Sequence, residues 1–133
     1  MPLKLLLDED YIGYVGDPVE FDLREIAVAR RENAAYLINE LKKIPEIQVW
    51  RDSLGESAIP LFVPIIVDPD VRGDLRRTLT EANIYCPIHW PVSPLHNEIG
   101  GLYDTELSLV CDQRYDIADM ERMIGIIKRY FNR

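Results

Sequence analysis

The sequence has few cysteines and no long hydrophobic segment. Two cysteines among 133 residues cannot form a disulfide framework, so we expect reduced thiols and a cytoplasmic protein. No apolar run approaches the ~20 residues that a transmembrane helix needs. The apolar run Leu5–Leu7 is also too short for the hydrophobic region of a signal peptide. These absences predict a protein without a membrane partner.

Positive charge is also scarce. The sequence has 15 Lys and Arg residues against 23 Asp and Glu residues, which gives a net charge of −8. A protein that binds DNA or RNA needs a basic surface to neutralise phosphates. Binding to an anionic membrane surface needs the same. The composition therefore argues against both a nucleic-acid partner and a membrane surface.

The motifs of the common catalytic classes are missing. There is no G-x-S-x-G nucleophile motif and no glycine-rich phosphate loop. His89 and His96 are the only candidate bases near neutral pH, and the sequence places no serine or cysteine to be activated by them. No lysine lies in the apolar pocket that Schiff-base chemistry requires. The lysines are Lys4, Lys42, Lys43 and Lys128. We predict that the chain alone is not catalytic.

A zinc site is a weaker interpretation of the cysteines and histidines. Cys86 and His89 have half of a zinc-binding spacing, and His96 with Cys111 would complete four ligands. Residues three apart on a strand point to opposite faces, however, and the second half lacks a closely spaced pair. Both cysteines are better interpreted as small buried hydrophobic residues, and we expect no metal.

The length and the local pattern predict one domain after an irregular start. A chain of 133 residues is too short for two domains. Residues 1–21 follow neither a helical nor a strand period and are interpreted as an irregular lead-in. Residues 22–133 are interpreted as a single domain.

The first helix of this domain begins at Asp22, with Glu25 three residues later in a capping-box spacing, and ends at Pro45. Arg30 interrupts the apolar stripe, and we interpret its side chain as lying over the core with its charge in water; an anionic ligand is the alternative.

The remaining segments predict strands and two more helices. Residues 47–51 and 61–67 are expected strands, and Pro64 makes the second an edge strand or a bulged one. Asp68 and Pro69 begin a helix, and Asn83 is its expected left-handed exit. Its arginines are expected in solvent, with a phosphate site as the alternative; they are Arg72, Arg76 and Arg77. Residues 84–90 and 107–111 are two more expected strands. Asp116 begins the last helix, with Asp119 three residues later.

The order of these segments is helix, strand, strand, helix, strand, strand, helix. It predicts an α+β fold: a small, mostly antiparallel sheet of three to four strands with about three helices packed on one face.

Four segments together resemble a known family. They are R-R-E-N-A-A-Y-L-I-N-E-L, I-P-L-F-V-P-I-I-V, the stretch from Arg72 through I-Y-C-P-I-H-W-P, and L-S-L-V-C-D-Q-R-Y-D-I-A-D-M-E-R-M-I. In this order the chain resembles the C-terminal small domain of fold-type I pyridoxal-phosphate aminotransferases, closest to the nucleotide-sugar (DegT/DnrJ-like) group. The resemblance covers roughly residues 22–131. Val110 stands where the family pattern has a proline after L-S-L.

The resemblance has consequences for cofactor, partner and site. In that family a large N-terminal domain supplies the cofactor lysine, the carboxylate facing the pyridine nitrogen and the phosphate-binding loop. None of these has a counterpart here, so pyridoxal phosphate is implied only for a complete enzyme and no cofactor is expected in this chain. The small domain closes over the substrate, and by resemblance His89, Trp90 and Arg114 are the substrate-proximal residues. For Arg114 the alternative is a surface ion pair with Asp112 or Asp116.

Two interpretations of the whole chain remain open. In the first, it is the small domain of an aminotransferase, inactive until it is joined to a large cofactor-binding domain. In the second, it is a free-standing, non-catalytic binding module with the same fold. In either case we expect apolar surface that is covered by a large domain or by self-association, for example as a homodimer.

Overall fold

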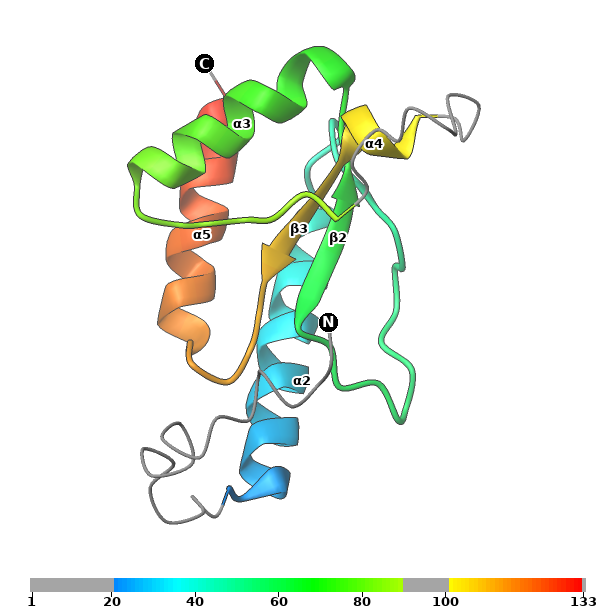
Figure 1. Ribbon diagram of the computed structural model, residues 1–133, viewed down its shortest axis with the longest axis vertical. Coiled ribbons are helices and arrows are strands. Elements are labelled where there is room, and N and C mark those ends of the chain that lie inside the picture. The colour runs from blue at the N-terminus through cyan, green and yellow to red at the C-terminus, as the bar shows by residue number, and fades with distance from the viewer. Residues whose placement is uncertain (1–20, 90–100, 133) are drawn as a thin grey trace, which may run out of the picture.

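The computed structural model describes residues 21–89 and 101–132 (Figure 1). The elements in chain order are α2 (Leu23–Leu41), β1 (Gln48–Val49), β2 (Phe62–Ile66), α3 (Pro69–Glu81), α4 (Leu102–Thr105), β3 (Glu106–Val110) and α5 (Ile117–Phe131). Of the lead-in expected over residues 1–21, only Phe21 belongs to the described residues.

The three strands form one antiparallel sheet in the order β1-β2-β3. In the β2–β3 pair, Val63 is opposite Leu109 and Ile65 is opposite Leu107. All four side chains are buried, so they lie on the face of the sheet that belongs to the core. The predicted α+β class with a small antiparallel sheet is confirmed.

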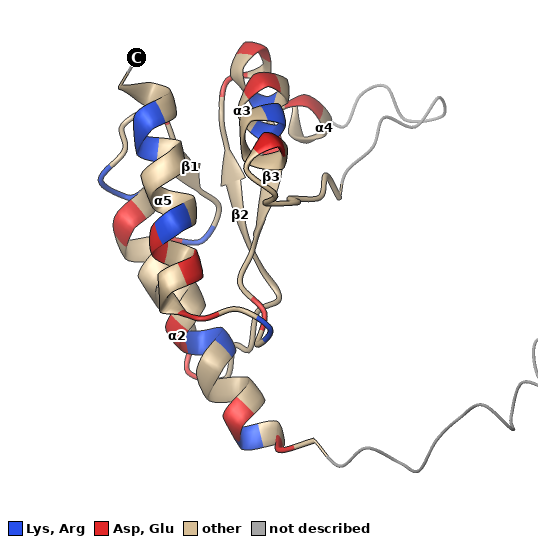
Figure 2. Ribbon diagram, turned by 90° about the vertical axis from the view of Figure 1, so that its left-hand side faces the viewer, with Lys and Arg blue, Asp and Glu red and all other residues tan. Residues whose placement is uncertain are grey.

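The helices complete the core. Figure 2 shows α2 and α5 on one side of the strands, and α3 packs against both α5 and β3. One continuous cluster joins buried residues of all three helices to the core face of the sheet. Its fully buried large side chains include Leu37, Leu41, Leu75, Leu79, Met120 and Ile127.

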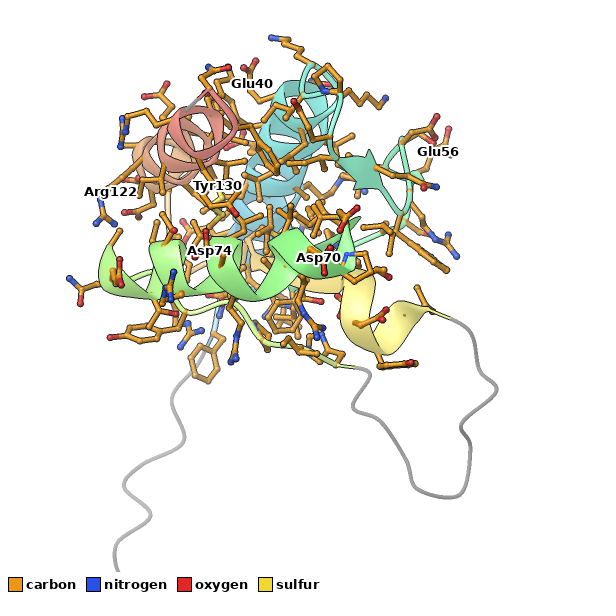
Figure 3. All side chains as sticks on the ribbon, turned by 90° about the horizontal axis from the view of Figure 1, so that it is seen from above. Glu40, Glu56, Asp70, Asp74, Arg122 and Tyr130 are labelled. Carbon is orange, nitrogen blue, oxygen red and sulfur yellow. The ribbon has the colours of Figure 1, made fainter. Side chains whose placement is uncertain are left out.

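Polar contacts at the outer edges of the helices join them further. The Tyr130 hydroxyl of α5 donates to Asp74 Oδ2 of α3 at 3.0 Å, and Lys128 Nζ of α5 lies 2.8 Å from Glu40 Oε2 of α2 (Figure 3). Acidic and basic residues are mixed along α3 and α5 in Figure 2, so neither helix carries a continuous basic stripe. α5 is thus joined to both other long helices.

The predicted helix starts are confirmed by their caps. The Asp22 carboxylate accepts hydrogen bonds from the backbone N–H groups of Arg24 and Glu25 at 2.9 and 3.2 Å. Asp68 accepts from the Asp70 N–H at 2.8 Å, and Asp116 forms a reciprocal capping box with Asp119. These side chains satisfy backbone donors that have no partner within the helix.

The helix ends agree less well with the predictions. α3 leaves through Asn83, which has φ 60°, so the predicted left-handed exit is confirmed. α2 ends at Leu41, earlier than the predicted stop at Pro45, because tighter turn hydrogen bonds take over: Lys43 N–H donates to Glu40 O and Ile44 N–H donates to Leu41 O. The first turns of α2 extend past the end of the sheet (Figure 1), which leaves Leu23 75% exposed although its spacing places it on the apolar stripe.

The prediction that Pro64 marks an edge or bulged strand is wrong. β2 is the central strand, and its pairing with β3 runs without a bulge from Phe62 to Ile66. The Pro64 carbonyl accepts from the Trp50 N–H at 3.0 Å, so the backbone of Pro64 faces β1. β1 ends at Val49, just before this position. The missing N–H therefore costs only one hydrogen bond at the very end of the short neighbouring strand.

The prediction of a strand over residues 84–90 is wrong for its described part. Residues 84–89 have no assigned strand, and Trp90 lies outside the described residues. This segment makes one ladder-like contact, in which Ser108 N–H donates to Pro87 O at 3.1 Å. Pro87 has no N–H to return the bond, so a regular ladder does not form. The described sheet therefore has three strands.

Two arginines of α3 donate hydrogen bonds to backbone carbonyl groups of this irregular segment, of α4 and of the start of β3. Arg76 Nε donates to Cys86 O at 3.0 Å, and Arg72 Nη1 donates to Tyr103 O at 2.7 Å and to Glu106 O at 3.3 Å. The predicted solvated position is therefore wrong for Arg72, which is half-buried, whereas Arg76 is exposed, as predicted, and its Nε also bonds to the backbone. Their long side chains satisfy backbone acceptors that no strand neighbour reaches.

Candidate functional site

The second face of the sheet, away from the core, carries the polar residues of the candidate site. Because side chains alternate along a strand, Phe62, Pro64 and Ile66 of β2 lie on this face with Glu106 and Ser108 of β3. The β2 residues are half-buried, whereas Glu106 and Ser108 are each only 1% exposed. Two polar side chains on this face are thus removed from water.

A hydrogen-bonded chain connects the two buried polar residues to His89. The Ser108 hydroxyl donates to Glu106 Oε1, and His89 Nδ1 lies 2.7 Å from Ser108 Oγ. The backbone N–H of His89 also points at Glu106 Oε2, at 3.4 Å. The His89 ring meets the Phe62 ring edge-on, with centroids 4.7 Å apart. His89 itself is exposed, so the chain runs from a buried carboxylate to an imidazole at the surface.

The order of the three side chains in this hydrogen-bonded series determines which chemistry they can support. In a Ser-His-Asp triad the imidazole lies between the hydroxyl and the carboxylate, and it removes the hydroxyl proton. Here the hydroxyl lies in the middle and donates to the carboxylate. Ser108 is therefore not set up as a nucleophile. The arrangement instead orients His89.

Arg114 lies elsewhere, in the loop between β3 and α5. Its guanidinium makes two hydrogen bonds to the Asp112 carboxylate, Nε to Oδ1 and Nη2 to Oδ2, both at 2.8 Å. The Arg114 backbone N–H donates to the same carboxylate, and the guanidinium carbon lies 5.5 Å from the centre of the Tyr115 ring. Of the two ion pairs considered from the sequence, Arg114 forms the one with Asp112. Within the described residues no hydrogen bond joins Arg114 to His89.

This ion pair predicts a pH-dependent effect on stability. The hydrogen bonds from Arg114 hold the pKa of Asp112 below its ordinary value of about 4. A carboxyl group with a lower pKa in the folded state stabilises the fold above that ordinary value, and the stabilisation is lost as the pH falls through the lowered pKa. We therefore expect Arg114→Gln to lower stability at neutral pH, and we expect the difference from the wild type to vanish in acid.

Urea unfolding of both proteins across the acid range measures this difference. Arg51→Gln, at another exposed arginine, is the matched control and should leave the stability nearly unchanged at every pH. A difference between wild type and Arg114→Gln that persists undiminished in acid would show that Asp112 is not the group being stabilised.

Arg30, the other arginine singled out in the sequence, is half-buried on α2. Its Nε donates to Gln113 Oε1 at 2.7 Å. The side chain thus joins α2 to the β3–α5 loop, and the guanidinium contacts protein rather than only water.

The other residues named from the sequence form no metal site within the part of the chain that the structure describes. Trp90 and His96 lie outside the described residues, and in residues 21–89 and 101–132 no three His, Cys, Asp or Glu side chains form a group able to hold a metal. Burial raises the pKa of the Cys86 thiol to about 11 and that of Cys111 to about 12. Both cysteines are buried small residues, as interpreted from the sequence, and neither is ionised at neutral pH.

The described lysines do not fit pyridoxal phosphate. A Schiff-base lysine needs a desolvated, uncharged amine in a pocket. Lys43 and Lys128 both pair with Glu40, whose pKa is lowered chiefly by the hydrogen bond from Lys128. Lys42 is exposed at the end of α2. These amines lie in water or in ion pairs, so no step through the cofactor follows from the described residues.

A groove of about 330 Å³ is lined by the segment between β1 and β2, by β2 and by Ile38 of α2; Val63 of the core face lines it as well as Phe62 of the second face. Arg31 holds the loop that borders it, because Nη1 donates to Gly55 O at 2.9 Å and to Ala58 O at 2.6 Å. Phe62 lines this groove and also meets His89. The other lining residues include Trp50, Leu54, Ala58, Pro60 and Pro64.

Sequence reasoning singled out His89 but missed Glu106 and Ser108. Polar residues at alternate positions of E-L-S-L usually indicate a solvated strand face. Here the backbone N–H and the ring of His89 contact Glu106 and Ser108, which the local pattern does not reveal. The sequence does show that Glu106 and Ser108 share one strand face. This spacing indicates a site only once His89 is known to contact both residues.

Among the described residues, no helix is long and apolar enough to cross a membrane. No protein-family model and no curated protein sequence matches the chain.

Solved structures do match. The aminotransferase TlmJ from Streptoalloteichus hindustanus is 22% identical with a TM-score of 0.65, over 79% of this chain and 31% of that chain. A DegT DnrJ EryC1 StrS aminotransferase from Brucella abortus is 23% identical with a TM-score of 0.63, over 81% and 32%. E. coli GDP-4-keto-6-deoxy-D-mannose-3-dehydratase, solved with bound hydrated PLP, is 20% identical with a TM-score of 0.61, over 78% and 31%.

The match covers only part of each of these proteins. The chain spans about a third of the length of these proteins, whereas the match covers about four fifths of the chain itself. The resemblance stated from the sequence is thereby confirmed as a likeness of fold: the chain has the fold of one part of the DegT/DnrJ/EryC1/StrS-type sugar aminotransferases.

Proposed function

We propose that this chain supplies the small domain of a pyridoxal-phosphate-dependent aminotransferase-like protein and is inactive without a large cofactor-binding domain. The observation that carries the proposal is the fold: four fifths of the chain match about a third of several sugar aminotransferases. The match includes a dehydratase as well as aminotransferases, so the fold itself does not select the reaction.

Exposed apolar side chains support a missing partner. Trp50 is 53% exposed and Tyr85 is 65% exposed, and Ile59 and Leu61 are exposed near the groove. Leu23, at the projecting end of α2, is exposed as well. Large apolar side chains that are this exposed are typical of surfaces that another protein body covers. In the proposed enzyme this body is the large domain.

The division of roles follows from the residues present. Pyridoxal phosphate, when it is bound by the large domain, supplies the electron sink for chemistry at the amino carbon. The described part of this chain contributes shape, exclusion of water and polar groups at the mouth of the site. Of the residues named by resemblance, His89 is the oriented one, and Arg114 contributes through its pair with Asp112. Trp90 completes the proposed substrate-proximal set.

The test of this proposal is the gene neighbourhood followed by co-expression. We expect an open reading frame adjacent to this gene, or continuous with it, that encodes a large domain with a cofactor lysine. Co-expression should give a complex that retains pyridoxal phosphate, while this chain alone does not.

A second function makes a different prediction in the same experiment. A free-standing binding module would bury its exposed apolar residues, such as Trp50 and Tyr85, by self-association. A stable homodimer in sedimentation equilibrium, without any neighbouring frame for a large domain, would replace the proposed function with this one.

A further inference from the structure

The groove between α2 and the β1–β2 segment continues along one side of α2 toward the start of that helix. Ile38 of α2 lines the groove. Arg31, two turns earlier on the same side of the helix, donates to the loop that borders the groove, and Arg24 lies two turns earlier again. We call this side of α2, from Arg24 to Ile38, the α2 track. The groove and the α2 track form one surface that ends where residues 1–20 join the described chain.

This surface combines exposed apolar groups with positive charge. Trp50 at the groove is 53% exposed, and Val28, one turn before Arg31, is 54% exposed. In the described part of the chain no acidic residue lines the groove, and the nearby Glu25 and Glu32 lie about 100° further around α2. No described carboxylate forms an ion pair with either arginine of the track. The surface therefore suits an occupant that is apolar at the groove, acidic at Arg31 and apolar again at Val28.

The lead-in has its residues in this order. Leu5–Leu7 is followed directly by the three acids Asp8–Asp10, and these are followed by Tyr11 and Ile12. Half of residues 1–20 are apolar, which is no lower than the 47% of the whole chain. Segments that remain in water have a lower apolar fraction. The lead-in therefore needs a surface that covers its apolar side chains.

The spacings on the two segments also agree. Arg31 and Ile38 are seven residues apart on a helix, which corresponds to about 10 Å along its axis. Leu6 and Glu9 are three residues apart, and an extended chain of that length also spans about 10 Å. Residues 13–20, which contain two glycines and a proline, remain to turn back to the start of α2.

We propose that in the isolated chain Leu5–Leu7 occupies the groove and Asp8–Asp10 lies against Arg31, so that the lead-in covers the surface around Trp50. The lead-in is covalently attached beside this surface, which gives it a high effective concentration relative to any free partner. In the proposed enzyme the large domain covers the same apolar residues and displaces the lead-in. The docking in the isolated chain does not depend on that displacement.

The experiment is acrylamide quenching of Trp50 fluorescence in the purified 133-residue chain. Trp90→Phe leaves Trp50 as the single tryptophan of this parent protein. Leu6→Asp places a charge in the apolar groove and should release the lead-in, which raises the quenching constant by about twofold to threefold because the indole becomes accessible. Val19→Asp makes the same kind of change in the connecting residues and should leave the quenching constant of the parent unchanged.

Circular dichroism shows whether each variant is folded, and the parent measurement tests the proposal without any variant. A Trp50 that is quenched in the parent as readily as free tryptophan would refute the docking, as would protection that Leu6→Asp leaves unchanged. Protection that disappears on dilution, together with a dimer in sedimentation equilibrium, would assign the surface to a second copy of the chain and overturn the proposal. These results leave the proposed function standing, because that function is tested by co-expression with the large domain.

Discussion

Replacing Asn33 with leucine is expected to destabilise the protein by about 2 to 4 kcal/mol. Asn33 is 2% exposed on α2, and its Nδ2 lies 2.9 Å from Tyr115 O and 3.3 Å from both Cys111 O and Asp112 O. This amide satisfies the carbonyls of the loop that leads from β3 into α5. Leucine has a similar volume but no donor, so buried acceptors would be left without a partner.

Urea unfolding measures the loss. Glu32→Leu is the matched control, because it makes the same kind of change at the preceding, exposed position of α2 and should alter the unfolding free energy by less than about 0.5 kcal/mol. Equal effects of the two substitutions would show that the amide of Asn33 does not hold the loop.

Truncation of Ile65 to alanine should cost about 2 to 5 kcal/mol. Ile65 is fully buried at the centre of β2, opposite the equally buried Leu107. Removing its methyl groups leaves a cavity between the sheet and the helices, which the surrounding side chains fill only in part.

The next residue provides a control of the same type. Ile66 lies on the opposite face and is half-buried, so Ile66→Ala should cost clearly less, about 1 kcal/mol. Thermal and urea unfolding of the two variants compare the faces directly. If Ile66→Ala were as costly as Ile65→Ala, Ile66 would contribute to the core as much as Ile65 does, which would contradict the assignment of the two faces.

The helices were predictable because their determinants are local. Asp22, Asp68 and Asp116 each precede an apolar stripe and cap a helix in the structure. A cap depends on residues within one turn, so the sequence contains the whole signal. The strand predictions were less secure because pairing depends on distant residues. Pro64 argued for an edge strand, and only the position where β1 stops explains why a proline fits the central strand.

The candidate site was predictable only in part. His89 could be named from its residue type and from the family resemblance. Its partners could not, because Glu106 and Ser108 acquire their role from a segment 17 and 19 residues away in the chain. Asn33 shows the same limit: it looks like a polar residue beside an apolar stripe, yet its partners are 78 to 82 positions distant.

The central proposal is that this chain has the fold of one part of a cofactor-dependent enzyme and is inactive alone, and that none of its described residues holds the cofactor. The most direct test is to incubate the purified 133-residue chain with pyridoxal phosphate and an amino donor, reduce it with borohydride and map the modified lysines by mass spectrometry. We predict weak, scattered labelling of exposed lysines, no cofactor absorption after desalting and no amino transfer. Full labelling of one lysine, together with amino transfer by the chain alone, would contradict the account.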